Sequence, residues 1–207
     1  MSLSNTLSTF RASASQCDCL VANAHQADAT GVAVLPALDQ RQITVAAFLN
    51  LFVSWETFLE ESLIELMVGS PTISGRVPVR YVSPPTIQAT RCLVIGVQRY
   101  FDYGNHDNVR KIVSMFFENG YPFEPHLSAI NTDLSDLRTM RNASAHITST
   151  TQAALEGLAQ RVFSTPRPGI DLYALLTTVD PRSALGNTVF AESREKLLVV
   201  AELVANG

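Results

Sequence analysis

The side chains best suited to chemistry are concentrated in one hexapeptide, Arg141 to His146, with the sequence RNASAH. An imidazole titrates near neutral pH and can take or give a proton, and a guanidinium can hold a phosphate through a planar fork of donors. The amide of Asn142 can both donate and accept a hydrogen bond. Because RNA cleavage needs such groups together, we take Arg141, Asn142 and His146 as candidate catalytic residues.

The hexapeptide lies in a segment with the apolar spacing of a helix. Apolar residues recur there at steps of three and four, and they are Leu127, Ile130, Leu134, Leu137, Met140 and Ile147. Asn142 and His146 are four residues apart and so share one side of the predicted helix, with Arg138 one turn earlier. The same string is also common on exposed helix faces, so the helical context is what favours a functional site.

Arg141 falls within the apolar stripe of this predicted helix, about 20° from Ile130 on a helical wheel. An unpaired charge buried there would be costly. Two arrangements remain open: the guanidinium extends to water, or a carboxylate from another helix pairs with it.

Glu56 is the candidate for that carboxylate. It lies in the most hydrophobic predicted helix, residues 42–68, and its neighbours at helical spacing are mostly apolar. We therefore expect Glu56 to face the packed side more than Glu61 or Glu65 do, and we hypothesise that it pairs with Arg141. A position at the edge of the stripe, in water, is equally compatible with the pattern.

These motifs together resemble a known family. The Trp55-Glu56-x-Phe58-Leu59 helix and the later string Arg138-x-x-Arg141-Asn142-x-x-x-His146 are similar to those of HEPN (higher eukaryotes and prokaryotes nucleotide-binding) domains, particularly the HEPN-like ribonucleases of bacterial defence and toxin–antitoxin systems. The similarity covers about residues 40–163.

The resemblance implies an up-and-down helical bundle that forms a homodimer with a composite active site. Such enzymes cut RNA without a metal or other cofactor, leaving a 2′,3′-cyclic phosphate and a 5′-hydroxyl. His146 would transfer protons, Arg141 would stabilise the phosphorane charge and Asn142 would orient His146 or the phosphate, while Arg138 and Glu56 would support them. The chain would be a toxin or antiviral effector, with an antitoxin or regulatory protein as a further partner.

The sequence also departs from the family pattern. Family members that are paired with a nucleotidyltransferase often carry a tyrosine two residues beyond the histidine, where this chain has Thr148. Other members have lost activity, so the alternative function is a catalytically silent module that binds nucleotide, RNA or a protein partner. A helical scaffold without a ligand is a third alternative.

Composition limits the other possibilities. The chain has 207 residues, 46% hydrophobic and 16% charged, with a net charge of −4. This balance predicts one folded domain over 1–207 and argues against nucleic-acid binding by bulk electrostatics, though a local site remains compatible with it. The apolar runs look too short and interrupted to cross a bilayer, and the N-terminus does not resemble a signal peptide, so we expect a cytoplasmic protein. Three cysteines without paired spacing suggest reduced thiols, and zinc binding is disfavoured.

The pattern predicts an all-α fold with helical extensions at residues 1–39 and 165–207. Residues 72–85 are predicted to form an extended loop or a small hairpin, because prolines lie at position 71, just before the segment, and at positions 78, 84 and 85 within it. His106 and His126 are expected in surface loops. The remaining helices are predicted at residues 3–29, 86–103, 108–118, 127–147, 151–163, 172–178 and 187–204.

Overall fold

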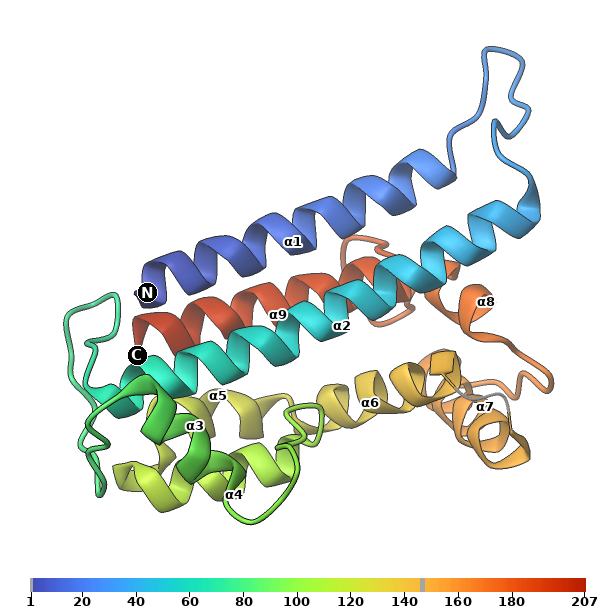
Figure 1. The fold of residues 1–207 in the computed structure, drawn as a ribbon. Helices are drawn as coiled ribbons and strands as arrows, with labels where there is room; N and C mark the ends of the chain where they lie inside the picture. The colour runs from blue at the N-terminus through green and yellow to red at the C-terminus, as the bar shows by residue number, and fades with distance from the viewer. Residues whose placement is uncertain (1, 146–147) are drawn as a thin grey trace. The chain divides into compact units, whose positions relative to one another are not determined.

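The computed structural model describes residues 2–145 and 148–207, and within them the chain is all-helical, as predicted. These residues form nine α-helices and no β-strand (Figure 1). The helices are α1 (Leu3–Ala24), α2 (Ala37–Val68), α3 (Ile87–Ile95), α4 (His106–Phe116), α5 (Phe123–Ala129), α6 (Asn131–Ala145), α7 (Ser149–Phe163), α8 (Leu172–Thr177) and α9 (Val189–Asn206).

The chain divides into two compact units. Unit 1 comprises Met1–Arg11, Ser54–Leu134 and Leu197–Gly207, and unit 2 comprises Ala12–Val53 and Ser135–Lys196. Helices α1, α2, α6 and α9 each contribute residues to both units. That residues 1–207 form a single HEPN-like domain stays a prediction.

The core of unit 1 is built around Trp55 on α2, which is fully buried. The rings of Phe10 and Phe58 lie 5.9 and 5.7 Å from the Trp55 ring, centroid to centroid. The indole Nε1 of Trp55 donates a 3.0 Å hydrogen bond to Nε2 of His106. His106 is only 4% exposed and begins α4, so the expectation of a surface histidine in a loop was wrong. A buried indole N–H needs an acceptor, and His106 provides it.

Helices α4 and α5 of unit 1 pack against each other. Helix α4 buries Val109, Val113 and Phe116 on one face, at helical spacing. On α4, Arg110 donates to the Glu124 carboxylate of α5, with Nη2 2.6 Å from Oε1. The proline-containing segment forms an extended loop with a turn, in which Thr72 N donates to Arg76 O. This agrees with the first of the two forms predicted for it.

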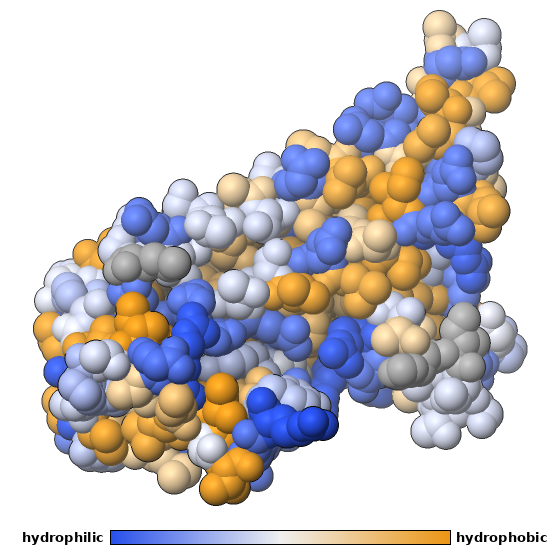
Figure 2. All heavy atoms as spheres, viewed as in Figure 1, coloured by the Kyte–Doolittle hydropathy of each residue, from blue (hydrophilic) through white to orange (hydrophobic). Residues whose placement is uncertain are grey.

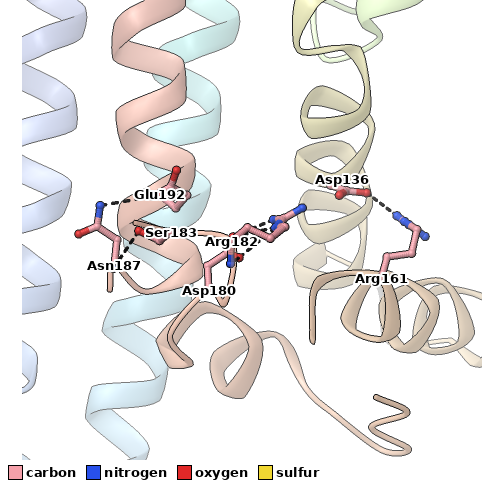
Figure 3. A network of polar contacts seen from close by, with 7 residues as sticks. All are labelled: Asp136, Arg161, Asp180, Arg182, Ser183, Asn187 and Glu192. Atoms are coloured by element: carbon pink, nitrogen blue, oxygen red, sulfur yellow. Dashed lines mark hydrogen bonds and ion pairs between the residues drawn. The ribbon is translucent and has the colours of Figure 1, made fainter. Parts of the chain in front are cut away.

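In unit 2, the buried side chains come mainly from the second half of α1, the first half of α2, helices α6, α7 and α8, and the start of α9. Examples are Phe48 on α2, Leu137 on α6, Leu158 on α7 and Leu175 on α8. Before α9, the carboxylate of Asp180 is 1% exposed and accepts hydrogen bonds from the backbone and guanidinium of Arg182 (Figure 3). Burial raises the pKa of Asp180, but these hydrogen bonds and nearby positive charges outweigh it, so the pKa is lowered.

Three predicted helices were too long. The first of them, predicted at 3–29, ends at Ala24. The segment 86–103 is helical only to Ile95, because Gly96 adopts φ +60° and closes α3 with a hydrogen bond to Cys92 O. The periodic segment 127–147 is divided between α5 and α6, which are separated at Ile130. The apolar spacing therefore continues through a point at which the helix is interrupted.

Two expectations about α2 also need correction. Glu65 is 3% exposed and accepts a 2.9 Å hydrogen bond from Ser70 Oγ, whereas Glu56 is half-buried. Glu65 is therefore the more buried of the two acids. Among the described residues, α2 is also the one helix with the length and apolar composition of a membrane-spanning segment, a property that core helices of soluble proteins share. The cytoplasmic location stays a prediction.

Candidate functional site

Helix α6 positions most of the predicted site residues. Its apolar side is anchored by Leu134, Leu137 and Met140, which follow one another at steps of three and are each at most 3% exposed. Arg138, Arg141 and Asn142 lie on the same helix and are half-buried. The helix thus presents these polar groups beside its packed face, as the apolar spacing predicts.

Arg141 and Asn142 contact each other directly. Nη1 of Arg141 donates a 3.3 Å hydrogen bond to Oδ1 of Asn142. The bond uses the acceptor of the Asn142 side chain, so its two amide hydrogens point away from the arginine and can donate to another acceptor. A guanidinium and an amide held in this way form a cluster of donors with a net positive charge.

The last turn of α6 carries small side chains. Ser144 Oγ donates a hydrogen bond to the backbone carbonyl of Arg141, three residues earlier in the same helix, so its hydroxyl is bonded within α6. Ala143 and Ser144 are half-buried and Ala145 is exposed. Side chains of this size leave room for a phosphate, or a second helix, to approach Arg141 and Asn142 closely.

His146 and Ile147 lie outside the described residues, and the description of the chain resumes at Thr148. Thr148 caps α7: its Oγ1 accepts from Thr151 N at 3.2 Å, and Thr151 Oγ1 accepts from Thr148 N at 2.9 Å. This reciprocal pair is the capping box that fixes a helix start. The motif is therefore bounded by the end of α6 and the beginning of α7.

An ion pair joins α6 to α7 at a position before the motif. Asp136, which is 7% exposed, accepts a hydrogen bond from the Arg161 guanidinium of α7 (Figure 3). The carboxylate compensates the charge of Arg161, so this pair holds α6 and α7 together more than it offers a binding group.

The structure thus brings Arg138, Arg141 and Asn142 together on one helix. Glu56 lies on the part of α2 that belongs to unit 1, whereas Arg141 belongs to unit 2. The hypothesis that Glu56 pairs with Arg141 stays a prediction, as do the roles of all five residues.

A second cluster, in unit 1, was not identified from the sequence. Arg91 on α3 donates to the carboxylates of Glu60 and Glu61 on α2, and a pocket opens beside it. The aromatic run Tyr100-Phe101-x-Tyr103 was the available signal, but it fell in a segment predicted to be helical.

The cysteines and the acidic residues do not form a metal site in the described part of the chain. No group of three His, Cys, Asp or Glu side chains is arranged there to hold an ion. All three cysteines are free thiols, and burial raises the pKa of Cys17.

No family model matches this chain, and no curated protein and no solved structure is similar enough to indicate a relationship. The geometry of the site therefore has to support any functional assignment.

Proposed function

We propose that this protein is a metal-independent endoribonuclease of the HEPN type. The observation that carries the proposal is the Arg141–Asn142 contact on α6, with His146 four residues beyond Asn142 in the sequence. A guanidinium and an amide that can also donate thus lie together where the R-N-x-x-x-H string of the resembling family would hold a phosphate.

In the proposed reaction, His146 accepts the proton of an RNA 2′-hydroxyl, whose oxygen attacks the adjacent phosphorus. The P–O5′ bond breaks, and a protonated His146 from a second copy gives its proton to the leaving 5′-oxygen. The products are a 2′,3′-cyclic phosphate and a 5′-hydroxyl. Arg141 stabilises the charge that develops on the phosphorane oxygens, and Asn142 donates to the phosphate or to His146.

The proposal extends to the context of the reaction. Two copies form a homodimer with a composite site, which brings two copies of Arg138 and Arg141 to one groove and creates a local positive patch on an acidic chain. The protein acts as a cytoplasmic toxin or antiviral effector and is controlled by an antitoxin or other regulatory protein.

The test is RNA cleavage by the purified chain in the presence of EDTA. We expect His146→Ala to reduce the cleavage rate at least about 100-fold, because general acid–base catalysis contributes that much or more. His25→Ala, at an exposed histidine of unit 2, serves as the matched control and should retain activity. Cleavage that persists in His146→Ala, or products with a 5′-phosphate, would contradict the proposed chemistry.

Mixing experiments test the composite site. If each site needs His146 from both copies, then replacing wild-type chains with His146→Ala chains at constant total protein concentration should lower activity with the square of the wild-type fraction. A linear decrease would show that one copy is sufficient. An intact dimer that cleaves no RNA but binds nucleotide or RNA would instead support the silent binding module.

A further inference from the structure

Unit 1 contains a pocket that the proposed ribonuclease reaction does not use. It encloses about 130 Å³ and lies between α2, the end of α3 and the loop that follows α3. An engineered protein cavity of about 150 Å³ binds benzene, so a pocket of this order has room for one small group. Its lining residues are Glu60, Arg91, Ile95, Tyr100, Phe101 and Tyr103.

The charges around the pocket sum to a negative value. Arg91 Nη1 is bonded to Glu60, and its Nη2 lies 2.6 Å from Glu61 Oε1, so one guanidinium faces two carboxylates. The pKa of Tyr103 is raised, mainly because the phenol is buried. The negative charges of Glu60 and Glu61 raise it further, and the positive charge of Arg91 opposes them. Because Arg91 is held by two acids, an anion would have to displace a carboxylate to bind it.

The end of α3 adds to the negative potential. Ile95 lines the pocket and is the last residue of this nine-residue helix, whose last turn contains no basic side chain. The carbonyl groups at a helix C-terminus carry a partial negative charge and favour a cation nearby.

The aromatic walls have a geometry suited to a cation. The rings of Phe101 and Tyr103 are 4.8 Å apart, centroid to centroid, and inclined at 67°, so they form a corner. Tyr100 contributes a third ring to the pocket and is 71% exposed. Figure 2 shows that apolar side chains reach the solvent in the part of unit 1 that contains α3 and α4. Aromatic faces attract cations through their quadrupole, and aromatic cages recognise quaternary ammonium groups.

We infer that this pocket binds an alkylated ammonium group, held by the three aromatic rings and the carboxylate of Glu60. The group belongs either to a free small molecule such as choline or to a methylated lysine side chain of a protein partner. The inference does not depend on RNA cleavage.

The test is a calorimetric titration of the full-length chain with tetramethylammonium chloride, with sodium chloride at equal ionic strength as the reference. We expect saturable binding that Tyr100→Ala weakens about fivefold, the effect of losing one cation–π contact at an exposed site. Tyr100→Phe keeps the ring and should bind as the wild type does. Tyr81→Ala, at another exposed tyrosine of unit 1, is the control and should change nothing.

Glu60→Gln keeps the shape of the side chain but removes its charge, and we expect it to weaken binding about tenfold. Choline and a trimethyllysine peptide then distinguish the two sources by which of them binds more tightly. A response equal to that of sodium chloride, wild-type affinity in Tyr100→Ala, or preferential binding of adenosine monophosphate would overturn the inference. Each outcome is measured without RNA and so is independent of the ribonuclease test.

Discussion

Arg91 in unit 1 and Arg141 in unit 2 are both partly buried arginines on helices, but their partners differ. Arg91 is held between the carboxylates of Glu60 and Glu61, whereas the side-chain contact of Arg141 is with the neutral amide of Asn142. A guanidinium paired with two acids has its charge neutralised, while one bonded to an amide keeps its charge for an anion. We therefore expect Arg91 to shape a pocket and Arg141 to be the arginine that contacts phosphate.

The largest expected difference is in RNA cleavage. Arg141→Ala should reduce the rate about 100- to 1,000-fold, the usual cost of losing one donor to a developing oxyanion. Arg91→Ala should leave the rate within about threefold of the wild type once the folded fraction is accounted for, because Arg91 is bonded to two carboxylates of unit 1 and takes no part in the proposed reaction. Equal losses in both variants would show that the comparison is wrong.

Arg141→Lys sharpens the same test. It keeps the positive charge but loses the planar fork, so we expect activity between those of the wild type and Arg141→Ala. Full activity in the lysine variant would indicate that charge alone is required. Circular dichroism of each variant checks that the helices are retained.

A structural arginine of unit 2 should affect stability instead of cleavage. Arg182→Gln leaves the buried Asp180 carboxylate without its guanidinium partner and should lower the free energy of unfolding by about 2 kcal/mol. Urea denaturation measures the change. Adding Asp180→Asn should recover part of the loss, because the buried charge is then removed; a further decrease in the double variant would contradict this account.

The smallest expected effect concerns His126 on α5, whose pKa is lowered by burial. The unfolded chain therefore binds a proton at higher pH than the folded chain does, and stability falls as the pH drops below the ordinary histidine value of about 6.5. Urea denaturation between about pH 5 and 8 should show a steeper loss of stability with falling pH in the wild type than in His126→Gln. Identical slopes would exclude His126 as a contributor.

The sequence predicts the fold where local signals agree with each other. The polar run at 148–151 offers several N-cap candidates for α7, of which the structure uses Thr148, and the helix ends at Phe163 as predicted. Gly69 follows the end of α2 at Val68. The errors in predicted helix length arise where the local sequence pattern continues past the end of a helix. Ile130 fits the apolar spacing of α6 but lies outside that helix, and Gly96 ends α3 within a segment whose residues otherwise favour helix.

For the candidate site, the sequence predicts only the arrangement of residues that are close together in the chain. Arg138, Arg141 and Asn142 share one helix, so their spacing alone places them together. The burial of His106 depends on Trp55, which is 51 residues away in the chain, and the pocket beside Arg91 depends on acids 30 and 31 residues away. Contacts of this kind arise from packing between helices, which a single sequence does not specify.

Thr148 has a consequence for how this chain can be controlled. Its hydroxyl is one bond from Cβ and so reaches the amide of Thr151 to start α7, whereas the phenol oxygen of a tyrosine lies too far from its own backbone to do so. The position that often carries a tyrosine in members of the resembling family paired with a nucleotidyltransferase is therefore occupied here by a helix-initiating residue. Attaching a bulky group to this hydroxyl would remove the cap and unwind the first turn of α7, next to the motif.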